Sequence, residues 1–452
     1  MDLGKLRDVV PNIYRKPRGS LLPRDCTIGC RFNEGLILRI LWVKTELLHP
    51  VDKGGKIRTY HMLKHLMRDH HVTYLSLDDG PADQEQRRLS REYCHELVTI
   101  HHRTQEKFTL RFYGELAINL LSGIPYAVRK YQSPQMEIEI RRRIADGKHD
   151  IVVCDFLAPS INLPDFLGCP SVLFQHNVEA MIWKRHYEVS RNLLSKAYLY
   201  LQWQKMKRLE RRECQKYDRV VAVSSNDRLI FETEYGVSAL SDVPTGVDFE
   251  FFTRGDVERV LPNSLVFTGS MDWLPNEDAI CYFSEAILPR VQRQIADVSL
   301  TIVGRNPSPR VLDLSRTHKS IQVAGRVEDV RPYMERAAVY IVPIRIGGGT
   351  RLKIYEAMSL KMPIVSTTVG AEGLPLESGR ELLIADTADE FAGAIIRVLR
   401  DHELAKRLGH DAALAVRERF GWKNAAEAFA EACSAAIAAY HARRSVDMPI
   451  RN

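Results

Sequence analysis

The sequence predicts an α/β protein with two tandem domains, each built on a doubly wound, mostly parallel sheet, that face a common cleft. The chain has 452 residues, 45% of them hydrophobic, which is more than one ordinary core can bury. Short apolar runs, typical of buried parallel strands, alternate with helical stretches. The same order of strand, glycine-bearing loop and helix begins twice, near residue 37 and near residue 264.

The first domain follows a segment of different character. Residues 1–36 contain Pro, Arg and Gly without hydrophobic periodicity, so we expect a disordered leader or a wrongly assigned start codon. The expected strands of the first domain lie at 36–44, 71–77, 150–156, 170–177 and 218–224. A loop with Gly54 and Gly55 follows the first of them and opens a helix, as in a Rossmann-like unit. The N-terminal Rossmann-like domain is therefore predicted to span 37–244.

The second half repeats this pattern. Its expected strands lie at 264–270, 298–304, 321–327, 339–344 and 363–370. An amphipathic helix is predicted at 276–294, between the first two of these strands. The C-terminal Rossmann-like domain is predicted to span 245–421, and the cleft between the domains is the expected ligand site. A last helix is predicted at 422–445. It could belong to either domain, and it would have to cross back along the molecule to pack on the N-terminal one.

Composition narrows the class of protein and its location. The net charge of +7 is concentrated at the N-terminus and in 180–216, where ten Lys and Arg stand against three acidic residues. A general nucleic-acid-binding face is therefore not expected, and no nucleic-acid partner is predicted. The eight cysteines are scattered, as in a reducing compartment. No apolar run reaches the roughly 18 to 20 residues of a membrane span, so we expect a cytoplasmic protein, at most peripheral to the inner face of the membrane.

The segment 339–374 carries the densest chemical signal. A strand ends before a loop of three glycines that includes Gly348 and Gly349, and Thr350 is a good N-cap for the helix that follows. Backbone N–H groups at such a helix start form an anion site. The alternative is an ordinary glycine-rich turn, which is common in α/β proteins.

Three charged residues in the first turns of this helix add to that signal. Arg351 and Lys353 are cations at a helix N-terminus, which is unfavourable unless an anion such as a diphosphate offsets them. Glu356 follows three residues after Lys353, where a carboxylate can accept both hydroxyls of a ribose. The alternative is a surface Glu–Lys pair.

The ordered motifs of the chain resemble those of family 4 glycosyltransferases, in the GGGTRLK-x-x-EAM variant of the donor motif. The resemblance covers most of 38–421. It rests on Gly54–Gly55, HNVE at 176–179, VSSND at 223–227, PTGVD at 244–248, FTGSMDWLPNEDA at 267–279 and AGRVEDV at 324–330. More narrowly, HNVE with GSMDWLPN is similar to the sugar transferases found with exosortase and exopolysaccharide loci. The resemblance implies the GT-B fold, with an N-terminal acceptor domain and a C-terminal donor domain.

The resemblance also implies roles for individual residues. Glu356 would bind the donor ribose, Arg351 and Lys353 the diphosphate, and His176 the transferred sugar or its phosphate. The remaining donor-binding positions would be Gly54, Gly55, Gly325, Arg326, Val327, Gly348, Gly349 and Thr350. A histidine after a strand, such as His176, is otherwise more often structural. Asp155, at the end of another strand, could be a polar cleft residue or a cap.

The chain departs from the family pattern at two places. The family carries two glutamates eight positions apart, and the earlier one falls on Gly348. The family's Arg and Lys after the first strand of the second domain are also absent, because Ser270 and the stretch 274–276 stand there. The identity of the donor sugar therefore cannot be inferred from the family. Arg351 and Lys353 would also have to neutralise more of the diphosphate's charge.

The predicted activity is transfer of a sugar, of the hexosyltransferase type, from a nucleotide-diphosphate sugar to a glycan or lipid-linked acceptor. The resemblance implies retention of configuration, and no nucleophile for a two-step route is visible. No D-x-D pair or full ligand set appears, so we predict no metal and no cofactor. The alternatives are a nucleotide-sugar epimerase and a non-catalytic nucleotide-sugar-binding partner. The basic, aromatic stretch 180–216 suits contact with anionic lipid, or a helix packing its aromatics on the first domain.

Overall fold

The computed structural model describes residues 37–51, 53–80, 84–105, 109–190, 192–253, 255, 260–346 and 352–446. The predicted leader at 1–36 lies outside these residues, as do the candidate site residues Gly348, Gly349, Thr350 and Arg351.

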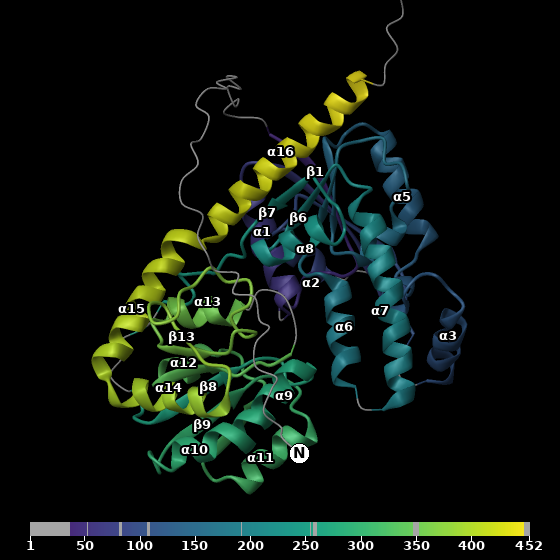
Figure 1. The fold of residues 1–452 in the computed structure, drawn as a ribbon. Coiled ribbons are helices and arrows are strands. Elements are labelled where there is room, and N and C mark those ends of the chain that lie inside the picture. The colour runs from purple at the N-terminus through teal and green to yellow at the C-terminus, as the bar shows by residue number, and fades with distance from the viewer. Residues whose placement is uncertain are drawn as a thin grey trace, which may run out of the picture. The chain divides into compact units, whose positions relative to one another are not determined.

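Two parallel sheets organise the chain (Figure 1). The first has the order β3-β2-β1-β4-β5-β6-β7 and the second β10-β9-β8-β11-β12-β13. The first comprises β1 (Arg39–Lys44), β2 (His71–Asp78), β3 (Glu96–His101), β4 (Ile151–Asp155), β5 (Ser171–Phe174), β6 (Arg219–Ala222) and β7 (Leu240–Asp242). The second comprises β8 (Ser264–Thr268), β9 (Ser299–Val303), β10 (Ile321–Gly325), β11 (Val339–Val342), β12 (Ile364–Ser366) and β13 (Leu383–Ile384). The predicted fold class is confirmed.

The central strands are buried on both faces because helices cover both sides of each sheet. All residues of β4, β5, β8 and β11 are buried. This is why their sequences are continuous apolar runs and not alternating ones. Strand order reverses between β1 and β4 in the first sheet and between β8 and β11 in the second. Those switch points are where parallel sheets bind ligands.

The helices connect these strands. Those of the first part are α1 (Gly54–Leu66), α2 (Gln84–Ser90), α3 (Leu110–Leu120), α4 (Tyr126–Arg129), α5 (Pro134–Ala145), the 3₁₀ turn η1 (Ala158–Asn162), α6 (Glu179–Val189), α7 (Leu193–Cys214) and α8 (Ser225–Thr233). Those of the second are α9 (Leu274–Tyr282), the π-helical turn η2 (Phe283–Ile287), α10 (Leu288–Gln292), α11 (Pro309–Thr317), α12 (Arg331–Glu335), α13 (Leu352–Ser359), α14 (Ala388–Arg400) and α15 (His402–Arg419). The chain's last helix is α16 (Trp422–Val446).

The helix predicted at 276–294 is three pieces and not one continuous α-helix. It starts earlier, at Leu274, with Pro275 in its first turn, where a proline is tolerated. The π-helical turn η2 then precedes α10, which has Pro289 near its start. Pro289 has no N–H to donate to the preceding turn, which accounts for the change of helical register.

Helix α16 packs on the first sheet, although it follows the second in sequence. Its Trp422 and Phe429 lie in one hydrophobic core with Trp42 of β1 and Phe174 of β5. Figure 1 shows α16 leaving α15 and running beside α1. We call the first sheet with its helices and α16 the N-terminal lobe, and residues 247–420, which share another core, the C-terminal lobe.

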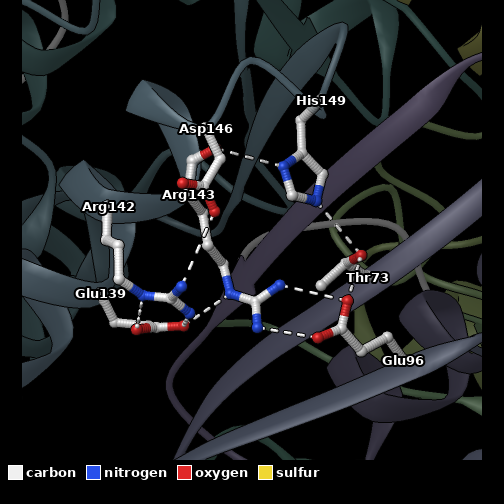
Figure 2. A network of polar contacts seen from close by, with 7 residues as sticks. All are labelled: Thr73, Glu96, Glu139, Arg142, Arg143, Asp146 and His149. Carbon is white, nitrogen blue, oxygen red and sulfur yellow. Dashed lines mark hydrogen bonds and ion pairs between the residues drawn. The ribbon is translucent and has the colours of Figure 1, made fainter.

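A polar network fixes α5 to the far edge of the first sheet. Arg143 of α5 pairs with Glu96 of β3 at 2.8 Å and with Glu139 at 2.6 Å (Figure 2). Glu96 accepts from Thr73 of β2, and His149 Nε2 lies 3.2 Å from the same threonine hydroxyl. Partly buried ion pairs of this kind define how a helix sits on a sheet more than they add stability.

Candidate active site

A cavity of about 1070 Å³ lies between the carboxyl ends of the two sheets. Most of the described candidate residues line it, namely Gly54, Gly55, His176, Arg326, Val327, Lys353 and Glu356. Gly325 ends β10 with a φ of +69°, a left-handed conformation that favours glycine, directly before Arg326. The fold therefore gathers, around one cavity, residues that lie up to about 300 positions apart in the sequence.

Lys353 and Glu356 enter the cavity from the first turns of α13. The Lys353 ammonium donates to the carbonyl oxygen of Thr268 at 2.8 Å and to Oδ1 of Asn276 at 3.0 Å. It also lies 4.0 Å from the centre of the Phe267 ring. These contacts hold the cation at the carboxyl end of β8, beside the cavity.

Burial raises the pKa of Glu356. Loss of solvent raises the pKa of its carboxyl group to about 7, and the Lys353 charge opposes this only in part. The group therefore changes charge near neutral pH, which is typical of functional sites.

His176 lies against Asp155 at the end of the first-sheet strands. Its Nε2 is 2.7 Å from Asp155 Oδ1, and both side chains are almost fully buried. Burial lowers the pKa of the imidazole to about 3, although the Asp155 carboxylate acts in the opposite direction. His176 is thus neutral at physiological pH, with its Nε2 beside the Asp155 carboxylate.

Asp155 is the centre of a buried network behind the cavity wall. Its Oδ2 accepts from Lys44 Nζ at 2.7 Å, from Thr59 Oγ1 at 2.6 Å and from Trp42 Nε1 at 3.0 Å. Burial alone would raise the pKa of this carboxyl, but the charges of Lys44 and the contact with His176 hold it well below its usual range. Asp155 is therefore an anion that orients His176.

Phe156 completes this wall in a strained conformation. Its φ is +75°, and its ring stacks on His176 at 3.8 Å between centroids. Gly55 packs against it so closely that an added Cβ would lie 2.7 Å from the Phe156 ring. Positive φ at a bulky residue is costly and is characteristic of functional sites.

Arg305 and Arg58 are cations of the cavity wall that the sequence patterns did not point to. Arg305, after β9, donates from Nε to Ser270 Oγ at 2.7 Å, so a cation stands beside the position where the family's arginine is absent. The signal was the pair Gly304–Arg305 at a strand end. A Cβ on Gly304 would lie 1.7 Å from the Gly269 carbonyl oxygen, so only glycine allows these two loops to touch. Arg58, on α1, also lines the cavity.

Among the described residues, no group of three or more His, Cys, Asp or Glu side chains could hold a metal ion. In the same part of the chain, every helix falls short of the length and apolarity needed to span a membrane.

Two family models match the chain, one in each lobe. Residues 53–251 match "Glycosyltransferase Family 4", and residues 262–401 match "Glycosyl transferases group 1". An uncharacterized 44.6 kDa protein in the cps region of Klebsiella pneumoniae is 22% identical over 402 residues, covering 85% of this chain and 97% of that protein. A D-inositol 3-phosphate glycosyltransferase of Streptomyces bingchenggensis is 27% identical over 258 residues, or 50% of this chain and 56% of that protein.

Solved structures show the same fold. Sucrose-phosphate synthase of Thermosynechococcus elongatus superposes with a TM-score of 0.67 at 15% identity, covering 89% of this chain and 100% of that one. HepE of Anabaena, in complex with UDP and glucose, gives 0.60 at 13% identity, covering 88% and 99%. With one matching model in each lobe and this fold throughout, the chain belongs to the family 4, or group 1, glycosyltransferases, retaining GT-B enzymes that use nucleotide-sugar donors.

Proposed function

We propose that the enzyme binds a nucleoside diphosphate sugar in the cavity between the lobes and transfers its hexose to a glycan or lipid-linked acceptor. One observation carries the donor site: Lys353 and Glu356, three residues apart on α13, both line the cavity. Glu356 binds the ribose, and Lys353 with Arg351 binds the diphosphate. Residues 325–327 border the base, and Gly348, Gly349 and Thr350 contribute backbone groups to the phosphates. Uridine diphosphate sugars are the first donors to test, because the Anabaena relative of like fold holds UDP.

The chemistry we propose is front-face substitution. The bond from the anomeric carbon to the diphosphate oxygen breaks, and the acceptor hydroxyl oxygen bonds to the same face of that carbon. The hydroxyl proton passes to the departing diphosphate. Lys353 and the neighbouring Arg305 stabilise the charge that develops on the leaving group, which is the electrostatic strategy open to a site without a metal. His176, neutral and held by Asp155, contacts the sugar and does not supply a proton.

Epimerisation of the donor is the alternative chemistry in such a cleft, and it needs acid and base groups around the sugar. The described carboxylates that line the cavity, Asp272, Glu328 and Glu356, all come from the C-terminal lobe. None faces the sugar from the side of His176, which favours transfer. Incubation with donor alone separates the two, because an epimerase converts the free nucleotide sugar and a transferase at most hydrolyses it slowly. A partner that only binds nucleotide sugar would do neither and would show no transfer.

We place the reaction in the assembly of a capsule or exopolysaccharide, at the inner face of a membrane. The Klebsiella relative from a cps region supports this setting. The aromatic side chains of the basic stretch 180–216 are less suited to lipid contact, because Trp183 and Trp203 pack against a hydrophobic cluster of the protein itself. Helix α3 instead exposes Leu110 at 93% and Ile118 at 75%. Co-sedimentation with lipid vesicles that Ile118→Ser weakens would support peripheral contact through α3; equal binding by Ile118→Ser and the parent would contradict it.

The donor site is tested by Lys353→Ala. We expect kcat to fall about 10²- to 10³-fold, because a preorganised charge that meets the leaving group is lost. Arg351→Ala should behave in the same way. Lys423→Ala, at a 77% exposed side chain, is the matched control and should keep full activity. The assay follows transfer with and without EDTA and the anomeric configuration of the product by NMR. Full activity in Lys353→Ala, or strict dependence on Mg²⁺, would contradict the proposed site.

A further inference from the structure

Arg58 is a buried cation in the wall of the cavity contributed by the N-terminal lobe. It lies on α1, one turn after Gly54, and only 5% of its surface is exposed. Its Nε donates to Thr245 Oγ1 at 2.9 Å. Among the residues that the structure describes, no carboxylate oxygen lies within 4 Å of its guanidinium nitrogens. The side chain borders the same cavity as Lys353 and Glu356.

The carboxylates whose charges act on Arg58 form their hydrogen bonds with other residues. Asp155 and Asp227 both act on it only through space. Asp155 already accepts from three donors and contacts His176, and Asp227 accepts from the hydroxyl of Ser224 at 2.8 Å. Burial lowers the pKa of Arg58 to about 10, so the guanidinium stays charged at neutral pH. A buried charge without a contacting counter-ion is costly, and an anion entering the cavity would offset that cost.

The start of α1 is suited to the same anion. Helix α1 begins at Gly54, has no side-chain cap at its N-terminus and carries no acidic residue in its first turn. Gly54 and Arg58 are four residues apart, so they share one face of the helix, and both border the cavity. The backbone N–H groups of Gly54 and Gly55 at the start of the helix and the guanidinium of Arg58 therefore lie on the same side.

This side of α1 faces the donor helix directly. A Cβ on Gly54 would lie 3.8 Å from Cδ1 of Leu352, the first residue of α13. The starts of α1 and α13 thus meet at one end of the cavity, where Lys353 stands on the opposite lobe. An anion bound at the start of α13 is within reach of both lobes.

We propose that Arg58, with the first turn of α1, binds the donor's diphosphate from the N-terminal lobe, so that the two lobes grip the leaving group together. This inference rests on the proposed donor site in the cavity. It adds a cation from the N-terminal lobe. Arg58 belongs neither to the donor motif nor to the positions where the family carries its other Arg and Lys. A phosphate carried by the acceptor offers the same chemistry, and the experiment has to separate the two sources.

The test compares Arg58→Met with Lys64→Met, which removes one charge from the exposed face of the same helix. Calorimetry gives the affinities for UDP, or whichever nucleoside diphosphate binds the parent enzyme best, and for the matching nucleoside. We expect Arg58→Met to weaken diphosphate binding about 10- to 100-fold and to leave nucleoside binding within about threefold, as for loss of a charge-assisted hydrogen bond. Arg58→Lys should restore part of the affinity, and Lys64→Met should bind like the parent.

A structural role for Arg58 makes a different forecast. If Arg58 only ties α1 to the linker between the lobes, Thr245→Val should lower diphosphate affinity as much as Arg58→Met, and nucleoside binding should fall in parallel; either result would overturn the inference. Unchanged diphosphate binding in Arg58→Met, with a raised KM for a phosphorylated acceptor, would move the site to the acceptor and also overturn it. Failure of the parent to bind any nucleoside diphosphate would instead reject the proposed function. Melting curves identify a variant that does not fold, and Arg58→Lys then carries the test.

Discussion

Glu356 is the residue whose charge state sets the pH range for donor binding in the proposed site. Its pKa of about 7 means that the carboxylate needed to accept ribose hydroxyls is lost as the pH falls below 7. We expect kcat/KM for the donor, which reports the free enzyme, to fall about tenfold per pH unit on that acid side. Glu356→Gln should remove this acid limb and raise the donor KM more than it lowers kcat. A parent enzyme with a flat kcat/KM between pH 6 and 8 would contradict the assignment.

Ionisation of Glu356 favours donor binding at high pH, but its raised pKa lowers the stability of the folded protein there. The folded-state pKa of Glu356 lies above its unfolded value, so the contribution of this group to the free energy of unfolding is present at low pH and is lost as the pH rises through about 7. Glu356→Gln should therefore melt at a higher temperature than the parent at pH 8 and at a similar one at pH 5. Melting curves at the two pH values check this.

Gly55 lies where the structure has no room for a side chain. An alanine Cβ would lie 2.7 Å from the Phe156 ring, so Phe156 and the stacked His176 must shift. We expect Gly55→Ala to cost about 1 to 3 kcal/mol of stability and to lower transfer activity. Gly114→Ala, on α3, is the matched control, since nothing lies within 4 Å of the added methyl. That change should leave activity intact and stabilise the protein by up to about 1 kcal/mol. Equal melting temperatures for the two variants would contradict the packing argument.

At the scale of elements, α16 is a structural part of the N-terminal lobe. Phe429 is fully buried and lies 5.2 Å from Trp42 and 4.9 Å from Phe174 between ring centroids. We expect Phe429→Ala to lower the free energy of unfolding by about 3 to 5 kcal/mol through lost contacts and a cavity. Glu427→Ala, at an exposed position of the same helix, should stay within about 0.5 kcal/mol of the parent. Denaturant titration measures both, and a small effect for Phe429→Ala would mean that α16 packs only loosely on the sheet.

An ion pair joins the two lobes of the molecule. Arg185 of α6 donates to both carboxylate oxygens of Glu372, at 2.9 and 3.1 Å, and both side chains are partly exposed. A double-mutant cycle with Arg185→Ala and Glu372→Ala should give a coupling of about 0.2 to 1 kcal/mol, and 0.5 M NaCl should reduce it. Because the pair bridges the two lobes that bind the donor in the proposed site, each single change should raise the donor KM and leave kcat nearly unchanged. A coupling energy of zero would show that the contact does not hold the lobes together.

Only part of the fold and site was predictable from the sequence. Parallel strands buried on both faces are continuous apolar runs, so their repeated alternation with helices identified both sheets. Lys353 and Glu356 were found because they share one helix, where a spacing of three residues fixes their relation locally. The prediction of one α-helix at 276–294 missed the π-helical turn within it, because a single proline changes the helical register without disturbing the apolar pattern.

The α/β class, the twofold repeat of the sheet pattern and the residues of the donor helix follow from the local sequence, because they depend on periodicities within a few turns of chain. Long-range packing, and no local pattern, places Asp155 against His176, Arg305 beside Ser270 and Arg58 in the cavity wall. It also places α16 on the first sheet. The physical reason is that all strands of a parallel sheet end at one edge, so neighbours in the site come from loops far apart in sequence, and local patterns carry no information about which of them meet.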